Sequence, residues 1–193
     1  MITGLTGMSG AGKSTVCGLL ARRGFTVIDC DEISRETSRD RDFLNGLERR
    51  FPENLLGEDG FLDRELTARA IFNDCAKLRL YDMIIFPYIV YKIMRLIERS
   101  EGDIILDAPT LFDSGLDMIC GKIVGVTASL EKCAERLILR DGITKARALE
   151  RLSAQCGEEF FRSRCDYIIE NNGDLSDFAE SAEGIADKLK GSL

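Results

Sequence analysis

Residues 7–14 read Gly7-Met-Ser-Gly-Ala-Gly-Lys-Ser14 and are followed by Thr15. This stretch fits the pattern G-x-x-x-x-G-K-[ST], in which glycines let the backbone curl so that successive N–H groups face phosphate oxygens. Lys13 can supply a positive charge to the β- and γ-phosphates, and the Ser14 hydroxyl can coordinate Mg²⁺. The stretch therefore predicts a phosphate-binding loop; the competing interpretation is a glycine-rich turn that binds nothing.

The residues around this stretch predict a β–loop–α–β unit. Residues 2–6 form a short apolar strand candidate, and apolar side chains at helical spacing over 13–23 predict a helix that Gly24 ends. Residues 25–29 predict a second strand. The helix would present its positive end to the phosphates, and such a unit implies a parallel sheet.

The chain changes character after the second strand. Residues 32 to about 100 are charged, amphipathic and helix-rich, and Asp74 can cap a long helix that Pro87 would kink or divide. Further strands are expected at 103–108, 122–127 and 167–169, and further helices after Ser129, over 144–155 and over 178–189. We interpret the helical block as an insertion into an α/β sheet.

Composition limits the chemistry that is available. The 193 residues suit one domain, and a net charge of −7 argues against general binding of nucleic acid. No histidine is present, which excludes imidazole relays and bases. The seven cysteines include no C-x-x-C pair and suit a reducing cytosol. No signal peptide or membrane span is apparent, so we expect a cytoplasmic protein that binds no membrane.

Three aspartates follow predicted strands. Asp29 and Asp31 close the second strand, and Asp107 ends the apolar segment Ile104-Ile-Leu-Asp107, which has the form of a Walker B element. Carboxyl ends of parallel strands line the ligand crevice, where a carboxylate can hold Mg²⁺ indirectly or accept a proton from an attacking hydroxyl. The alternatives are a helix cap, especially at Asp31, and a simple strand-end turn at Asp107.

Arg136 and Arg140 stand four residues apart on one predicted helix face. Paired guanidinium groups at a helix end can neutralise charge on a transferring phosphoryl group. A solvated surface face is the more common fate of such a pair.

Together these segments resemble the dephospho-coenzyme A (dephospho-CoA) kinase family. The segments that carry the resemblance are Ile28-Asp-Cys-Asp31, Gly60-Phe-Leu-Asp-Arg64 with Leu66 and Phe72 after it, Asp107-Ala-Pro-Thr-Leu-Phe-Asp-Ser-Gly-Leu116, Arg136 to Asp141, Gln155, and Asp166 to Gly173. They run in the family's order over nearly the whole chain. Two features depart from the family: Phe86-Pro87 replaces a His-Pro pair, and Phe160 and Phe161 stand where a basic residue is usual, with Arg162 beside them.

The resemblance implies a single α/β domain over 1–193, a three-layer α/β/α P-loop kinase with a five-stranded parallel sheet. Its core would span 1–31 and 103–193, a helical coenzyme A-binding insertion about 32–100, and a mobile lid about 136–160. The activity implied is ATP-dependent phosphorylation of the ribose 3′-hydroxyl of dephospho-CoA, giving coenzyme A and ADP, with Mg²⁺. The acceptor could instead be a nucleoside, a nucleotide or another small metabolite.

The resemblance also implies roles for individual residues. The catalytic residues would be Lys13, Asp31, Arg136 and Arg140. ATP would contact Gly10, Ala11, Gly12, Lys13, Ser14, Thr15 and Asn171, and Mg²⁺ would contact Ser14 and Asp29. The acceptor would contact Thr6, Asp31, Arg64, Asp107, Pro109, Leu111 and Phe112. The expected partners are these small molecules, with weak self-association left open.

A GTPase-like switch is disfavoured because Asn-Lys-x-Asp and Asp-x-x-Gly are both absent; a non-catalytic P-loop binding protein remains an alternative.

Overall fold

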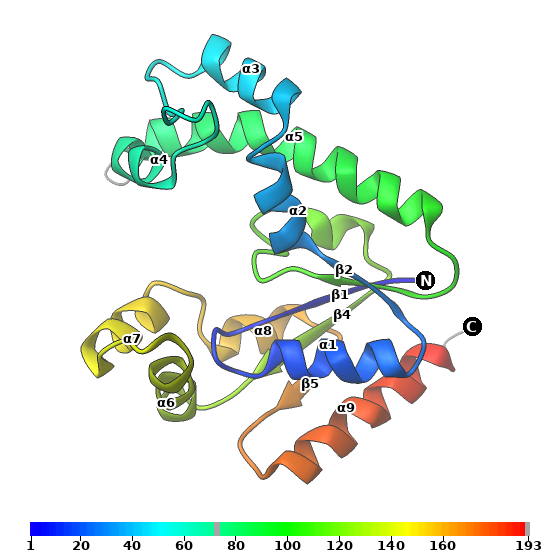
Figure 1. The fold of residues 1–193 in the computed structure, drawn as a ribbon. Coiled ribbons are helices and arrows are strands. Elements are labelled where there is room, and N and C mark those ends of the chain that lie inside the picture. Colours follow the sequence, from blue (N-terminus) through cyan, green and yellow to red (C-terminus); the bar gives the residue numbers. More distant parts are fainter. Residues whose placement is uncertain (72–73, 192–193) are drawn as a thin grey trace. The chain divides into compact units, whose positions relative to one another are not determined.

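The computed structural model describes residues 1–71 and 74–191 (Figure 1). Phe72, which contributes to the resemblance above, lies outside these residues. The chain forms two compact units, one made of Met1–Ile28 with Ser100–Leu193 and the other of Asp29–Arg99. We call them the sheet unit and the helical unit.

A five-stranded parallel sheet organises the sheet unit, as predicted. The strands are β1 (Ile2–Gly7), β2 (Thr26–Asp29), β3 (Ile104–Asp107), β4 (Lys122–Thr127) and β5 (Tyr167–Glu170), in the order β2-β3-β1-β4-β5. Leu5 of β1 lies opposite Asp107, and Gly7 lies opposite Val126, in parallel register. The carboxyl ends of β1, β3 and β4 therefore meet at one edge of the sheet, where ligands bind in open parallel sheets.

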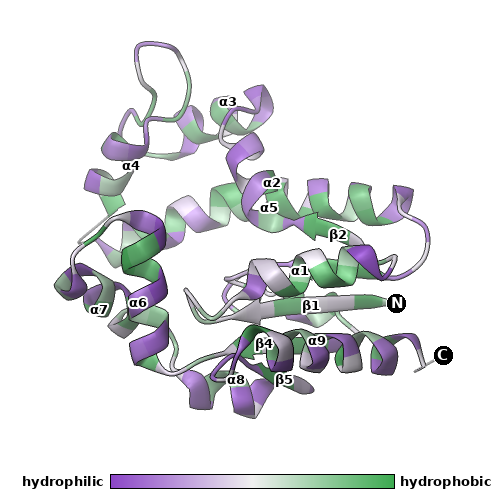
Figure 2. Cartoon of the chain, turned by 60° about the horizontal axis from the view of Figure 1, so that its bottom comes forward, coloured by the Kyte–Doolittle hydropathy of each residue, from purple (hydrophilic) through white to green (hydrophobic). Residues whose placement is uncertain are grey.

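Helices cover this sheet. They are α1 (Lys13–Arg22), α6 (Leu130–Asp141), α7 (Lys145–Ser153), α8 (Glu158–Arg164) and α9 (Leu175–Lys190), with a short 3₁₀ helix at Leu116–Ile119. The helix α1 packs on α9, α6 packs on α7, and α8 contacts β4 and β5. Figure 2 shows hydrophobic and hydrophilic segments alternating along α1 and α9. This alternation is typical of helices with one buried face, and the side chains of Leu20 and Phe178 fill that face.

Local capping sets where α6 and α7 begin and end. The Ser129 side chain accepts a hydrogen bond from the Lys132 N–H, as the predicted helix start requires, and Gly142 ends α6 with a φ of 65°. Thr144 caps α7 by accepting from the Arg147 N–H. Two helices joined by so short a connection form a hairpin.

The helical unit is built around α5 (Cys75–Arg99), which contacts α2 (Cys30–Thr37), α3 (Arg41–Arg50) and α4 (Arg64–Ile71). Asp74 caps α5, as predicted, by accepting hydrogen bonds from the N–H groups of Ala76 and Lys77 at 3.0 Å each. Pro87 lies within α5 without dividing it. In the described part of the chain, no helix is long and apolar enough to cross a membrane.

Candidate active site

The predicted phosphate loop joins β1 to α1 at the carboxyl edge of the sheet. Gly10 and Gly12 have φ values of 80° and 106°, which side-chain-bearing residues rarely adopt. A Cβ atom at Gly10 would lie 2.7 Å from the Cys133 carbonyl oxygen, and one at Gly12 would lie 2.5 Å from the Asn171 side-chain nitrogen. Both glycines are therefore required by conformation and by space, and the loop has the open backbone that phosphate binding needs.

Arg136 and Asn171 brace the outer side of this loop. Arg136 donates to the Gly10 carbonyl at 3.2 Å and to the backbone and side-chain oxygens of Asn171 at 3.1 and 3.0 Å. Asn171, which is buried, donates to the Ala11 carbonyl at 2.7 Å. These hydrogen bonds fix the backbone of the loop from its outer side. Arg136 thus contacts the loop itself, whereas the sequence suggested a clamp on the phosphates.

A second brace joins the tip of the loop to the segment after α7. The Gln155 side chain donates from Nε2 to the Ser9 hydroxyl at 2.8 Å, and its Oε1 accepts the Ser9 N–H at 3.2 Å. The phosphate-loop pattern leaves position 9 unspecified, so the pattern alone assigns Ser9 no role. Ser9 and Gln155 are 146 residues apart, so no local sequence pattern could predict that they form a hydrogen bond.

Lys13 forms an ion pair with Asp107, and both side chains are largely buried. This contact places the predicted Walker B aspartate beside the phosphate loop. Two residues further on, the Pro109 carbonyl accepts a hydrogen bond from the Thr6 hydroxyl at 3.2 Å. The loop after β3 is therefore fixed to the end of β1.

A cavity of about 370 Å³ adjoins the loop, and its lining includes Ser9, Pro109, Phe112 and Phe160. The ring centroids of Phe112 and Phe160 are 5.4 Å apart in an edge-to-face arrangement, which makes an apolar wall. Leu111, by contrast, is fully buried and packs over Gly4. Of the seven residues expected to contact the acceptor, Pro109 and Phe112 line this cavity.

Arg140 is held by its neighbour Asp141. Its Nε and Nη2 donate to the two carboxylate oxygens of Asp141 at 2.7 and 3.0 Å, and Arg151 of α7 donates to the same carboxylate at 2.9 Å. The hydrogen bond from Arg140 is the main cause that holds the pKa of Asp141 below its usual value. The Arg140 side chain is 59% exposed, so it remains accessible to a ligand. No sequence pattern predicted this cluster of Arg140, Asp141 and Arg151.

The helical unit carries the other predicted carboxylates. Asp29 caps α2 by accepting the Glu32 N–H at 2.9 Å, so the alternative of a helix cap applies to Asp29 and not to Asp31. The reason is that α2 begins at Cys30, which puts Asp31 inside the first turn, where its side chain is exposed. Arg64 begins α4 and is also exposed.

The site suits a Mg²⁺ ion that is held mainly by the phosphates of a bound nucleotide and by water. Among the residues that the structure describes, no cluster of three acidic, cysteine or histidine groups could enclose a metal. Ser14 is exposed in the first turn of α1, next to the glycines of the phosphate loop. Mg²⁺ commonly takes one or two protein ligands and completes its shell with water and substrate phosphates, which fits this arrangement.

Comparison with known proteins gives one consistent family. The dephospho-CoA kinase family model matches residues 1–177. The dephospho-CoA kinase of Fusobacterium nucleatum is 33% identical over 190 residues, which cover 98% of each chain. The crystal structure of TT1252 from Thermus thermophilus has a TM-score of 0.85 at 32% identity and covers 98% of this chain and 97% of that one. The dephospho-CoA kinase from Campylobacter jejuni shares the fold, with a TM-score of 0.70 at 23% identity over 100% of this chain and 98% of that one.

Proposed function

The chain belongs to the dephospho-CoA kinase family, and we propose that its phosphate loop and the residues around the loop perform the reaction of that family. The activity is ATP-dependent phosphorylation of the ribose 3′-hydroxyl of dephospho-CoA, which gives coenzyme A and ADP in the last step of coenzyme A biosynthesis. The site assignment rests on the phosphate loop, in which Gly10 and Gly12 are required by conformation and space, and on Lys13, which follows it.

In this proposal the loop residues 10–15 bind the phosphates of ATP, with Asn171 on the outer side. Lys13 exchanges Asp107 for the β- and γ-phosphates, where its charge stabilises the transition state. Mg²⁺, when bound, neutralises phosphate charge; the Ser14 hydroxyl would coordinate it, and Asp29 would hold it through water. The Asp29 Oδ1 already accepts the Glu32 N–H, so Oδ2 would be the oxygen that serves the metal.

Asp31 is the proposed base that orients the ribose hydroxyl and accepts its proton. Phe112 and Pro109 would contact the acceptor directly, since both line the cavity beside the loop. Thr6 and Leu111 would act through that loop, because Thr6 is bonded to the Pro109 carbonyl and Leu111 anchors the segment in the core. Asp107 and Arg64 complete the acceptor contacts.

Arg140 is proposed to reach the transferring phosphoryl group by exchanging its bonds to Asp141 for phosphate oxygens. Arg136 would serve the same step by holding the loop in shape. We place the enzyme in the cytoplasm and expect weak self-association at most, which sedimentation velocity would measure.

A phosphoryl-transfer assay tests the acceptor directly. Dephospho-CoA, adenosine and nucleoside monophosphates would be compared at saturating ATP and Mg²⁺. We expect kcat/KM for dephospho-CoA to exceed that for adenosine by at least about a hundredfold, since binding of the pantetheine arm can be used to orient the ribose. Equal or better transfer to adenosine or a monophosphate would favour a nucleoside or nucleotide kinase instead.

A further inference from the structure

One arginine of the sheet unit stacks on two aromatic rings at once. The guanidinium carbon of Arg164, the last residue of α8, lies 5.0 Å from the ring centre of Phe160 and 5.4 Å from that of Phe112. The two rings are themselves 5.4 Å apart and nearly perpendicular, at 89°. A cation within about 6 Å of a ring centre is attracted to the electron-rich face of the ring. These three side chains, which we call the Arg164 cluster, therefore hold one another in place.

The guanidinium group of Arg164 has no second kind of partner. Within the part of the chain that the structure describes, it takes part in no hydrogen bond or ion pair. Arg162, two positions earlier on α8, is different, because it donates to Glu158 at 2.8 Å and forms an ion pair with Glu170. An exposed arginine loses conformational freedom when it is ordered, so a favourable contact has to offset that loss. For Arg164 this contact is the pair of rings.

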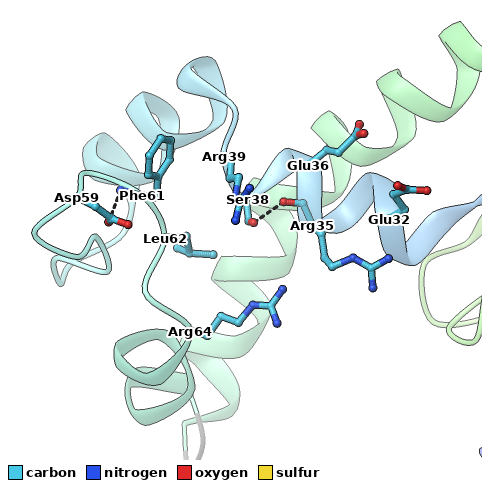
Figure 3. A pocket seen from close by; sticks show the side chains of 9 residues that line it. All are labelled: Glu32, Arg35, Glu36, Ser38, Arg39, Asp59, Phe61, Leu62 and Arg64. Atoms are coloured by element: carbon cyan, nitrogen blue, oxygen red, sulfur yellow. Dashed lines mark hydrogen bonds between the residues drawn. The ribbon is translucent and has the colours of Figure 1, made fainter.

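Arginines that line a cavity of the helical unit are arranged differently. Arg35, Arg39 and Arg64 line a cavity of about 820 Å³, and Figure 3 shows the side chains of Arg35 and Arg64 extending into the space between α2 and α4. Among the described residues, none of these three lies over an aromatic ring. Arg164, by contrast, does not line the cavity beside the phosphate loop but contacts two residues that do, Phe112 and Phe160. It therefore acts on the wall of that cavity and not on its contents.

Phe112 is the ring that needs this support. It lies in the turns between β3 and the 3₁₀ helix, so no regular element fixes its side chain. Its neighbour Leu111 is fully buried, whereas Phe112 is half-buried and lines the cavity of about 370 Å³ beside the phosphate loop. A side chain can adopt several staggered rotamers, so a half-buried ring on a turn keeps one direction only where its neighbours exclude the others.

The helix α8 is a fixed support for this contact. Phe160 and Arg164 are four residues apart and therefore share one helix face. Elsewhere on α8, Phe161 is buried in the core. Just after the helix, Cys165 packs against β4, where a Cβ atom at Gly125 would lie 2.8 Å from the cysteine sulfur. The helix is thus held against the sheet and presents one ring and one cation to the turn after β3.

We propose that Arg164 is a positioning residue for the acceptor: by stacking on Phe112 and Phe160, it holds the Phe112 ring in the direction in which this ring meets the acceptor. The inference rests on the proposed function, which gives Phe112 its contact with the acceptor. Arg164 itself contacts neither substrate. Its loss should therefore weaken binding of the acceptor and leave the chemical step unchanged, because loss of uniform binding raises KM and not kcat.

Steady-state kinetics on full-chain variants test this role. Arg164→Ala should raise the KM for dephospho-CoA about fivefold, while kcat and the KM for ATP stay within about twofold. Arg164→Lys keeps a cation near the rings and should restore most of the acceptor binding, whereas the uncharged Arg164→Gln should behave like Arg164→Ala. Arg162→Ala, on the same helix, is the matched control and should change no constant more than about twofold. The inference is overturned if Arg164→Gln binds the acceptor as well as Arg164→Lys, or if kcat and the KM for ATP change as much as the KM for dephospho-CoA.

A double-mutant cycle shows whether Arg164 acts through the ring. Phe112→Leu removes the ring and should itself raise the KM for dephospho-CoA. Adding Arg164→Ala to Phe112→Leu should then change this KM by no more than about twofold, because the ring to be positioned is gone. If the two effects multiply instead, Arg164 acts by another route and the positioning role is wrong.

The unmodified protein separates this inference from the proposed function. If it transfers phosphate to dephospho-CoA far better than to adenosine but the Arg164 variants change nothing, the acceptor is right and the positioning role is wrong. If it shows no such preference, the proposed acceptor is wrong and the positioning role falls with it.

Discussion

The positive charge of Lys13 can pair with two different anionic groups. In the structure its partner is Asp107, and in the proposed reaction it is the β- and γ-phosphates. Lys13→Ala should lower kcat by about 10²–10³-fold, because one positioned charge stabilises the transition state by about 3–4 kcal/mol. Steady-state kinetics with ATP and dephospho-CoA measure this. Lys145→Ala, exposed on α7, is the control, and a folded Lys13 variant with normal turnover would exclude this role.

Asp31 tests the proposed base. Asp31→Asn keeps the shape of the side chain and removes its charge, so kcat should fall about 10²–10⁴-fold while the KM for ATP changes little. Glu32→Gln changes the next exposed carboxylate of α2 and should leave kcat unchanged. If both variants retain activity, proton transfer at this position does not limit the reaction.

The cysteines give a prediction that depends on pH. Burial raises the pKa of Cys120 to about 11 and that of Cys165 to about 12, so at pH 8 almost no thiolate forms at either. Cys75 and Cys156 are exposed. Brief treatment with iodoacetamide should label Cys75 and Cys156 first, as mass spectrometry would show. Cys120 should gain reactivity only as the pH rises toward 11, and Cys165 only as it rises toward 12. Fast labelling of Cys165 at pH 8 would contradict its burial.

At the scale of elements, α6 carries two arginines with different surroundings. Arg136→Ala should lower both the free energy of unfolding, by about 1–3 kcal/mol, and the affinity for ATP, because the Gly10 carbonyl and Asn171 lose their donor. Arg140→Ala should leave the melting temperature unchanged and lower kcat alone. Thermal unfolding, ATP titration and kinetics would be run on both variants. Identical profiles for the two would show that they share one role.

The elements themselves were largely predictable, because each has a local cause. The caps at Ser129 and Asp74 are side chains that bond to their own helix, so the sequence alone indicates them. The sequence left open which aspartate caps α2, because Asp29 and Asp31 are equally good caps and only the end of the strand decides between them. The pairing of Ser9 with Gln155 has no local cause and therefore left no local signal.

At the scale of the whole molecule, the sequence predicted which segments form the candidate site better than it predicted what each side chain contacts. The phosphate loop required glycines at fixed positions, so Gly10 and Gly12 were identifiable from spacing. The two partners of Arg136 depend on how β5 and the loop meet, which spacing does not show.

The composition of the whole chain also sets how it should respond to reductant. All seven cysteines are free, so no disulfide contributes to stability. The melting temperature of freshly purified protein should therefore be the same with and without dithiothreitol, within about 1 °C, since loss of a disulfide typically costs several kcal/mol. A lower melting temperature in reductant would reveal a cross-link that the structure does not contain.

Asp31, Arg35 and Arg39 follow one another at intervals of four along α2 and just after it, and this spacing has a consequence for how the chain can change length. A substitution at Asp31, Arg35 or Arg39 alters one contact, but one inserted residue between Asp31 and Arg35 turns everything after it by about 100° around the helix axis. Asp31 would then lie on a different side of α2 from the two arginines that follow it. The loop between α3 and α4 faces no such restriction, because added residues there can bulge into solvent. Variation by insertion and deletion should therefore be tolerated at 52–60 and excluded between positions 31 and 39.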